Sequence, residues 1–505
     1  MKKMIAINKK IYWGDLHSHC SISYGEGKLE SAIQRAAQQL DFCSITGHAF
    51  WHDMNQLSNK YVDIKKYHKK GFLKLKKNWP KIIDNLKKFE KKYTINIFPS
   101  YEWHSLKFGD HNIYSKDFNL KLKNASNLQK LKKKLTKNHL IIPHHIGYGK
   151  NFRGINWNYF SKSLSPFVEI FSMHGCSIDE KNSSPMLHDM GTLSGIGTAE
   201  YGWKKNFKFG VIGSTDHHGG YPGSYGDGMV AAIAEKNTKE EIWKAFKKRN
   251  VYALTGDKIN LRFTINDQEM GSEIKNCKKR IIKIKVNSMS SISHVMLFKN
   301  DMIFKLLYSN SQNTDSELIQ GSIRLSWGWG RKNKIIKWNG KVILLNGTIT
   351  GLDSCFRGIP KLDPEQKKQN YLNVIDLPHK CEIIDNHSFK FASITSGNYS
   401  LKDPGYQSIN FKIKGDVMSK INLSINDRNY QIKIREIIKS GSKVIYPNKW
   451  LNELIKIGPF NNINELFLNK KIVDNNPLYE TDRYRVEVVQ HNGHRAWSSP
   501  IWVTQ

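Results

Sequence analysis

Short apolar runs in the first half of the chain repeatedly end in histidines and carboxylates. The run at residues 10–14 leads into D-L-H-S-H at residues 15–19, which sets His17 and His19 two positions apart. Side chains alternate along a β-strand, so both imidazoles would project from one face, where they can bind a single divalent cation. Similar endings follow at residues 46–48, 101–104, 143–145, 169–174 and 215–218. The pattern therefore predicts a fold that gathers strand ends around a hydrolytic metal centre.

The spacing of apolar residues predicts alternating strands and helices through about residue 255. Expected strands cover residues 12–17, 42–46, 95–102, 140–143, 167–171, 209–214 and 229–234. Expected helices cover residues 28–40, 59–93, 126–138 and 239–248. This alternation predicts an α/β fold with a parallel sheet, open or closed into a barrel. The candidate ligands would lie at the C-terminal ends of the strands, where such enzymes build their active sites.

The chain changes character after Thr255-Gly256, so two domains are expected, at residues 1–256 and 257–505. Strands are expected at residues 259–265, 280–286, 293–298, 323–327, 341–345, 408–414, 421–425, 431–434 and 484–489. Few helices separate them, which predicts an all-β, sandwich-like domain. Five of its tryptophans are expected to pack it against the first domain; they are Trp327, Trp329, Trp338, Trp497 and Trp502. In the alternative, a loop carrying Arg331 or Arg357 closes over the metal centre and helps to select the substrate.

A formal net charge of +35 raises the question of a nucleic-acid partner. Lysine is spread along the whole chain, and its densest stretch, residues 65–92, has apolar residues at helical spacing. That stretch predicts an amphipathic helix with a solvated basic face, so a small anionic substrate is favoured over nucleic acid. The 6 cysteines form no C-x-x-C motif, and no run is apolar enough to span a membrane. We expect a cytoplasmic protein, or a periplasmic or secreted one if an export signal has been removed. The oligomeric state stays open.

The candidate metal ligands are the histidines and carboxylates at the strand ends: His17, His19, His48, Glu102, His144, His145, Glu169, Asp216 and His218. Asp216 and His218 are two positions apart, so His217 between them should face away. Glu102 ends a strand that would otherwise be buried, where an isolated charge is costly, so it suits a bridge between two metals. Asp15 is either a strand-end cap or a carboxylate that orients an imidazole.

Several positions leave alternatives open. Adjacent strand residues point in opposite directions, so a regular strand would offer only one of His144 and His145 to a metal. One of Glu169 and His174 is expected to be a ligand or an acid/base group. The candidates for contact with the substrate are His174, His217 and Arg153. The donors exceed the roughly four that one closed zinc site uses, which predicts two or three divalent ions. Mixed imidazole and carboxylate donors favour Zn, Mn or Fe over Mg.

The order of these motifs resembles that of the PHP (polymerase and histidinol phosphatase) superfamily. D-L-H-S-H, T-G-H, a strand-end Glu, a further His and a final D-x-H follow one another between about residues 10 and 255. The resemblance implies a distorted (β/α)7 barrel with a cluster of up to three metals. It also implies a ligand set, namely His17, His19, His48, Glu102, one of His144 and His145, Asp216 and His218.

Within that superfamily the chain looks most like a poorly characterised bacterial branch. It shares with that branch G-D-L-H-x-H, G-D-H-N-I-Y at residues 109–114 and R-A-W-S-S-P-I-W at residues 495–502. Two departures concern the ligands. Residues 46–48 read T-G-H where the family has T-D-H, and a histidine that the family places shortly after His19 has no match.

These observations predict a metal-dependent hydrolase that acts on a phosphoester through a metal-activated hydroxide. Hydrolysis of another electrophile at the same centre, such as a phosphotriester, amide, lactone or sulfate ester, is the open alternative. A non-enzymatic nucleic-acid binder is a third hypothesis. Scattered lysines without an aromatic-lined basic motif do not favour it.

Overall fold

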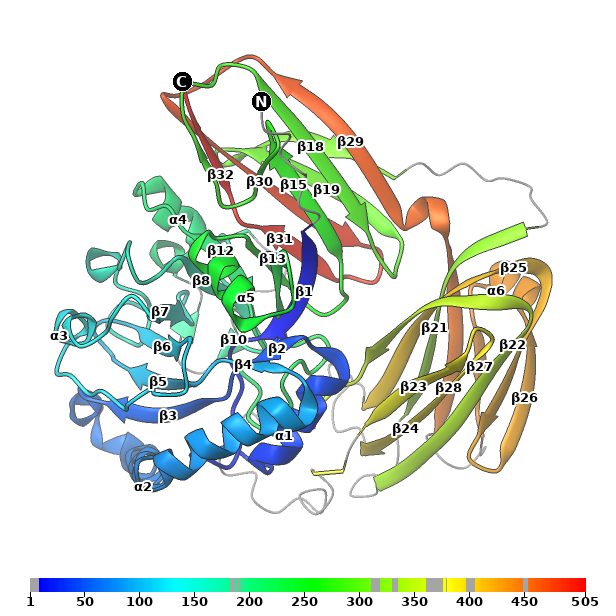
Figure 1. The fold of residues 1–505 in the computed structure, drawn as a ribbon, viewed down its shortest axis with the longest axis horizontal. Coiled ribbons are helices and arrows are strands. Elements are labelled where there is room, and N and C mark those ends of the chain that lie inside the picture. Colours follow the sequence, from blue (N-terminus) through cyan, green and yellow to red (C-terminus); the bar gives the residue numbers. More distant parts are fainter. Residues whose placement is uncertain are drawn as a thin grey trace.

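The computed structural model describes residues 9–181, 187–188, 191–192, 194–309, 318–328, 335–359, 376–377, 379–396, 405–447 and 453–505. The first half of the chain is a mixed α/β structure, and the second half is built mainly from strands. Figure 1 shows the α/β part at the lower left, one β body above it and a second β body on the right. Both β bodies belong to the second half of the chain.

The N-terminal ligand motifs lie on or directly after parallel strands, and helices connect these strands. The elements are β1 (Lys10–Asp15), α1 (Leu29–Gln39), β2 (Phe42–Cys43), β3 (Thr46–Trp51), α2 (Val62–Tyr93), β4 (Asn96–Ile97) and β5 (Ser100–His104). Strands β1, β2 and β4 pair in parallel, as do β3 and β5. The helices pack on the strands because their buried residues recur at helical spacing, among them Ile33 of α1 and Leu75 of α2. These elements confirm the expected ones, except that two expected strands are interrupted, at residues 44–45 and 98–99.

The other strands of the first half depart from an all-parallel order. The elements are β6 (Asp110–Ser115), α3 (Leu128–Lys133), β7 (His139–His144), β8 (Phe167–Ser172), β9 (Gly175–Cys176), β10 (Leu187–His188), β11 (Gly191–Thr192), α4 (Ala199–Lys204), β12 (Gly210–Gly213), β13 (Met229–Ala234), α5 (Lys239–Lys247) and β14 (Val251–Leu254). β8 and β12 are parallel, but β5, β6 and β7 run antiparallel, as do β1, β13 and β14. The described strands fall into separate sheets with few helices between them. The mixed α/β class is confirmed, whereas a closed (β/α)7 barrel is not.

Strand β6 lies where the sequence pattern predicts none. Its residues D-H-N-I-Y-S show no apolar alternation, yet all of them are buried. Two of its polar side chains have partners inside the protein: Asp110 accepts a hydrogen bond from Arg153 at 2.6 Å, and His111 Nδ1 lies 2.9 Å from the carbonyl oxygen of Gly109. A strand of this kind escapes pattern analysis because the partner of a buried polar group can lie far away in the sequence, as Arg153 does from Asp110.

The second half contains the two β bodies. The upper body comprises β15 (Asn260–Ile265), β16 (Gln268–Glu269), β17 (Glu273–Ile274), β18 (Arg280–Asn287), β19 (Ile292–Lys299), β20 (Met302–Leu307), β29 (Phe467–Asp474), β30 (Thr481–Gln490), β31 (Arg495–Ser498) and β32 (Ile501–Thr504). The right-hand body comprises β21 (Leu318–Gly328), β22 (Ile335–Cys355), β23 (Lys380–Asp385), β24 (Ser388–Ser396), β25 (Tyr406–Ile425), β26 (Arg428–Lys433), α6 (Ile434–Ser440), β27 (Lys443–Ile445) and β28 (Leu454–Asn462). Each strand expected for the second half overlaps one of these.

One sheet joins the two halves of the chain. Strand β14 of the first half pairs with β31 near the C-terminus, and β31 pairs in turn with β30. Trp497 on β31 is buried in a cluster with Phe171 and Ala253 of the first half. The division at residue 256 therefore stays a prediction, and the hydrogen-bonded sheet is continuous across it.

The tryptophans divide between two roles. Trp497 and Trp502 pack against the first half, as expected. Trp327 and Trp338 instead lie in the core of the right-hand body, where the Trp327 ring stacks on Phe391 with centroids 4.2 Å apart. Trp329 and Arg331 lie outside the described residues.

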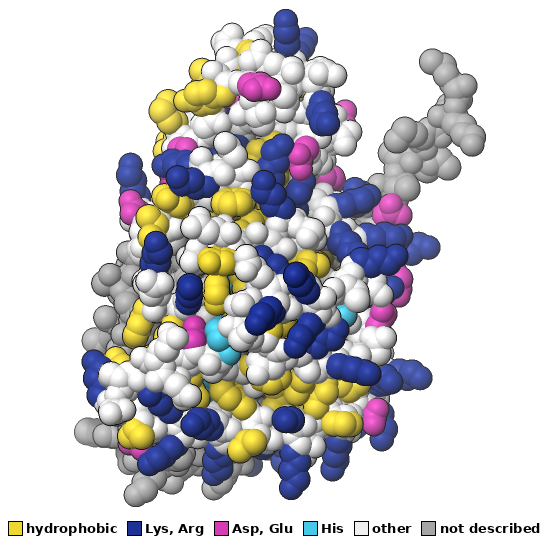
Figure 2. Space-filling model, turned by 90° about the vertical axis from the view of Figure 1, so that its left-hand side faces the viewer, with side chains coloured by type: hydrophobic (Ala, Val, Ile, Leu, Met, Phe, Trp, Pro, Cys, Tyr) yellow, Lys and Arg dark blue, Asp and Glu magenta, His cyan; other side chains and the backbone are white. Residues whose placement is uncertain are grey.

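On the face of the molecule that Figure 2 shows, basic side chains are spread out rather than gathered in one patch. Figure 2 shows Lys and Arg scattered across one whole face of the molecule, with few acidic side chains among them. The expected basic helix is present as α2, whose buried residues lie along one side. Within the part of the chain that the structure describes, every helix is too short or too polar to cross a membrane.

Trp497→Ala should lower the free energy of unfolding by about 3–5 kcal/mol, because it leaves a large cavity where β31 meets the first half. Chemical denaturation of the full-length protein would measure the loss. Leu478→Ala, at a side chain that is 58% exposed, should change stability by less than about 0.5 kcal/mol. Equal effects of the two substitutions would contradict a shared core.

Candidate metal centre

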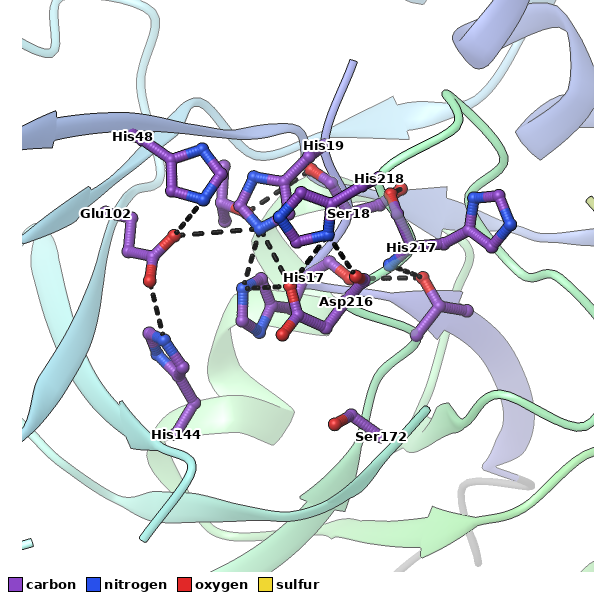
Figure 3. A network of polar contacts seen from close by, with 12 residues as sticks. His17, Ser18, His19, His48, Glu102, His144, Ser172, Asp216, His217 and His218 are labelled. Atoms are coloured by element: carbon purple, nitrogen blue, oxygen red, sulfur yellow. Dashed lines mark hydrogen bonds and ion pairs between the residues drawn. The ribbon is translucent and has the colours of Figure 1, made fainter. Parts of the chain in front are cut away.

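The D-L-H-S-H and T-D-H-H motifs face each other where β1 and β12 end. The two segments continue beyond their strands as a parallel contact between Ser18 and His217. The Asp216 amide donates to the carbonyl oxygen of His17 at 2.6 Å, and the His19 amide donates to that of His217 at 2.9 Å. This pairing brings the side chains of His17, His19 and Asp216 together (Figure 3).

Asp216 lies among five imidazoles, of which the most distant is His218, with Nδ1 3.8 Å from Oδ1. Its Oδ1 atom is 2.8 Å from His19 Nε2 and 3.2 Å from His17 Nε2. Its Oδ2 atom is 2.9 Å from His145 Nε2 and 3.0 Å from His174 Nε2. The backbone of Asp216 is left-handed, with φ of 52°. An aspartate rarely adopts this conformation, and such strain is often found where a side chain must be aimed at a functional site.

Glu102, in the middle of β5, occupies a similar position on the other side of the cluster. Its Oε1 atom lies 2.8 Å from His144 Nε2 and 3.3 Å from His104 Nδ1. Its Oε2 atom lies 3.2 Å from His48 Nε2 and 3.6 Å from His19 Nε2. The carboxylate thus stands between separate groups of imidazoles, as a bridging ligand would.

The side chains form five overlapping groups whose donor atoms lie within 4.8 Å of one another. The groups are His17, His19 and Asp216; His17, Glu102 and His144; His19, His48 and His218; His48, Glu102 and His104; and His145, His174 and Asp216. All of these residues are buried except His218, whose side chain is 23% exposed. The centre therefore opens to solvent on the side of His218.

Electrostatics favours a cation among these donors. Burial lowers the pKa of His19 to about 4 and that of His145 to about 3, so both imidazoles are neutral and keep a lone pair. Burial alone would raise the pKa of Asp216, but the surrounding imidazoles, His17 first, lower it well below its usual range. Glu102 Oε2 and Asp216 Oδ2 are buried and accept no hydrogen bond in the described structure. Buried carboxylate oxygens without donors are costly, and divalent ions held by these groups would remove that cost.

The structure refines the roles of several predicted ligands. Both His144 and His145 reach the cluster, because the chain leaves the strand after His144 and the left-handed φ of His145, 49°, turns its side chain back. Glu169 lies outside the donor groups of the described residues. It sits behind His17, with Oε2 3.0 Å from Nδ1, where it fixes the orientation of that ring.

The three residues proposed to contact the substrate have different surroundings. His174 joins a donor group through Asp216. Arg153 is held by Asp110, with Nε 2.6 Å from Oδ2, and its Nη2 lies 3.2 Å from His104 Nδ1. His217 faces away from the cluster, as expected from its place in the motif (Figure 3).

Two histidines belong to this region that the motif analysis did not assign to it. His104 faces Glu102, two residues away on β5, and joins a donor group. The i, i+2 spacing of Glu102 and His104 was the available signal. His68 of α2 packs its ring 5.7 Å from that of His104, and nothing in its local sequence marks it, because the contact depends on how α2 packs.

Asp15 acts as a cap that ties the two ligand segments together. Its Oδ1 atom accepts hydrogen bonds from the amides of His17 and Thr215, at 3.0 and 3.1 Å. Its Oδ2 atom accepts from the Thr215 hydroxyl at 2.6 Å and from the Gly223 amide at 2.9 Å. The carboxylate contacts backbone rather than an imidazole ring, which decides between the two roles expected for it.

Comparison with known proteins gives partial matches. Residues 222–277 match a family described as a protein of unknown function, DUF3604. Uncharacterized proteins of Chlamydia trachomatis and Chlamydia muridarum are each 28% identical over 207 residues, which is 38% of this chain and 33% of each relative. An uncharacterized protein of Chlamydia pneumoniae is 29% identical over 204 residues, 36% of this chain and 32% of that protein. The match thus spans about a third of the length of these relatives.

Among solved structures, a two-domain protein from Bacteroides vulgatus aligns with 62% of this chain and 82% of its own. It is described as containing a predicted PHP-like metal-dependent phosphoesterase, with a TM-score of 0.33 and 12% sequence identity. The likeness is too slight to define a fold or an activity for the present chain, so the functional argument rests on the geometry above.

Asp15→Ala should lower the free energy of unfolding by about 3 kcal/mol or more, because it leaves several buried donors unpaired at about 1–3 kcal/mol each. Asp15→Asn keeps the shape and one acceptor oxygen, so its loss should be smaller. Urea denaturation of both variants and the wild type would measure this. A loss of less than about 1 kcal/mol for Asp15→Ala would contradict the capping role.

His17→Ala and Asp216→Ala should each reduce the divalent metal that copurifies or can be reconstituted, because each removes a donor shared by two of the five groups. Elemental analysis of the purified variants would show it. His387→Ala, at an exposed histidine in the turn between β23 and β24, is the matched control and should keep the wild-type metal content. Wild-type content in both His17→Ala and Asp216→Ala would exclude this cluster as the metal centre.

Proposed function

We propose that the protein is a metal-dependent hydrolase that cleaves a phosphoester in a small anionic substrate, with two or three divalent ions of Zn, Mn or Fe. The observation that carries the proposal is the position of Glu102 and Asp216, each surrounded by imidazole nitrogens from different segments. Together with the imidazoles around them, the two carboxylates supply more donors than one ion uses. A shared-carboxylate centre suits the clamping of attacking and leaving oxygens.

Divalent ions bound at these donors would lower the pKa of water and offset the negative charge that develops on phosphoryl oxygens. The residues of the chain hold and orient the donors. Glu169 fixes the His17 ring through Nδ1. Asp15 holds the backbone on both sides of the paired segments. These contacts keep the donor geometry in place before a substrate arrives.

The exposed edge of the centre indicates how a substrate approaches. The side chain of His218 is 23% exposed, whereas those of His17 and His19 have no exposed surface. We place the substrate on the His218 side, next to Tyr24, whose ring stacks on His48 with centroids 3.6 Å apart. His174 is the group best placed to meet the phosphoryl oxygens, because Arg153 is already paired with Asp110.

We also propose that the strands of the first half form a distorted barrel. The contact between Ser18 and His217 links β1 to the sheet of β12, β8 and β9. The strands that carry the ligands would then curve around one centre, with the donors at their C-terminal ends.

The protein loaded with Mn²⁺ or Zn²⁺ should hydrolyse a chromogenic phosphomonoester or phosphodiester, and chelation should abolish turnover until metal is restored. His17→Ala should reduce turnover by on the order of 100-fold or more, since loss of a ligand exceeds the effect of losing an outer contact. His387→Ala should keep full activity. A panel of phosphoesters, phosphotriesters, amides, lactones and sulfate esters would measure this. Turnover confined to a class other than phosphoesters would refute the proposed substrate and leave the metal centre standing.

A further inference from the structure

The loop that follows the Asp216 and His218 motif is in contact with the second half of the chain. The amide of Tyr225 donates to the carbonyl oxygen of Phe356 at 2.9 Å, and the amide of Gly358 donates to the Ser224 hydroxyl at 3.0 Å. Residues 356–359 follow β22 of the right-hand body. The segment that begins with two candidate ligands is thus hydrogen-bonded to a strand end more than a hundred residues further along the chain.

The ring of His217 packs against this strand end. A Cβ atom placed on Gly358 would lie 2.6 Å from both Cε1 and Nε2 of His217, which is closer than any side chain tolerates. On its other side, His217 Nδ1 accepts a hydrogen bond from the Gly219 amide at 3.0 Å. The ring therefore has little room to move. Because Asp216 and His218 flank this residue, a shift of its ring would move both candidate ligands.

A buried ion pair holds the same loop further along. Asp257 is fully buried, and its Oδ1 atom accepts from the Tyr225 hydroxyl at 2.7 Å and from Arg324 Nη2 at 2.8 Å. Its Oδ2 atom accepts from Asn492 Nδ2 at 2.7 Å. Arg324 lies on β21 of the right-hand body, and Asn492 lies in the turn between β30 and β31 of the upper body. One carboxylate thus connects the ligand-bearing loop to both β bodies.

We propose that the second half positions the metal ligands Asp216 and His218, with Gly358 and Arg324 as the positioning residues. Gly358 holds the His217 ring, and Arg324 holds Tyr225 through Asp257. The proposal rests on the metal centre proposed above, but not on its substrate. It makes the right-hand β body a support for the ligand geometry.

The test measures metal affinity of the full-length protein, with zinc competed against a chromophoric chelator. Gly358→Ala should weaken zinc binding by about tenfold or more, the effect usual for contacts that orient a ligand. Gly351→Ala is the matched control, because a Cβ there meets only the Lys412 side chain at 3.6 Å, and it should bind zinc like the wild type. The absorption spectrum of the cobalt-loaded protein, which reports ligand geometry, should change in Gly358→Ala and not in Gly351→Ala.

A double substitution tests whether Gly358 acts on the ligands through the His217 ring. Adding His217→Ala removes the ring that the new Cβ would meet and leaves only its contact with Tyr221 Cβ, at 2.6 Å. Gly358→Ala with His217→Ala should therefore recover part of the zinc affinity and bind zinc more tightly than Gly358→Ala alone. If Gly358→Ala does not fold, Tyr225→Phe decides, since it removes only the hydroxyl that faces Asp257; weaker zinc binding supports the proposal, and wild-type binding overturns it. A folded Gly358→Ala that matches Gly351→Ala in affinity and spectrum also overturns the positioning role. A wild-type protein that binds no zinc, cobalt or manganese would overturn the metal centre itself.

Discussion

The parallel contact between the segment after β1 and the segment after β12 is the interaction on which the site depends. It sets His17 and His19 against Asp216, although these residues lie about two hundred positions apart in the chain. The backbone hydrogen bonds fix the register, and Asp15 locks it by accepting donors from both segments. A slip of one residue would turn every side chain of one segment to the opposite face and disperse the donors.

Charge balance explains why the cluster points to cations rather than to a set of ordinary ion pairs. Arg153 is already paired with Asp110, so it adds no net charge that could neutralise Glu102 or Asp216. Burial keeps the pKa of most of the imidazoles low, and His17 is the exception, because Asp216 and Glu169 more than offset its burial and raise its pKa to about 10. Burial also raises the pKa of Glu102 well above its usual range, so a second negative charge near Asp216 is costly, and divalent ions would remove that cost.

Local pattern predicted much of this arrangement and missed what depends on tertiary contacts. The two-residue spacings of His17 with His19 and of Asp216 with His218 were readable, because strand geometry dictates them. The place of Glu169 behind His17 was not, since a strand-end carboxylate can face either a metal or a ring. The backbone turn that brings His145 to the cluster departs from regular strand geometry. Strand β6 was hidden because its polar residues are buried, and Asp110 is paired with a residue far away in the sequence.

The two halves of the chain share one hydrogen-bonded framework. Strand β31 continues the sheet of β1, β13 and β14. Asp257 accepts hydrogen bonds from both β bodies and from Tyr225 in the loop that follows the ligands Asp216 and His218. Residue spacing suggested a boundary near 256 because the helical pattern ends there. The hydrogen bonds between β14 and β31 nevertheless join residues on both sides of this position. A buried carboxylate with partners from three parts of the fold fixes their relative positions more narrowly than apolar packing does, because each of its hydrogen bonds requires a particular distance and direction.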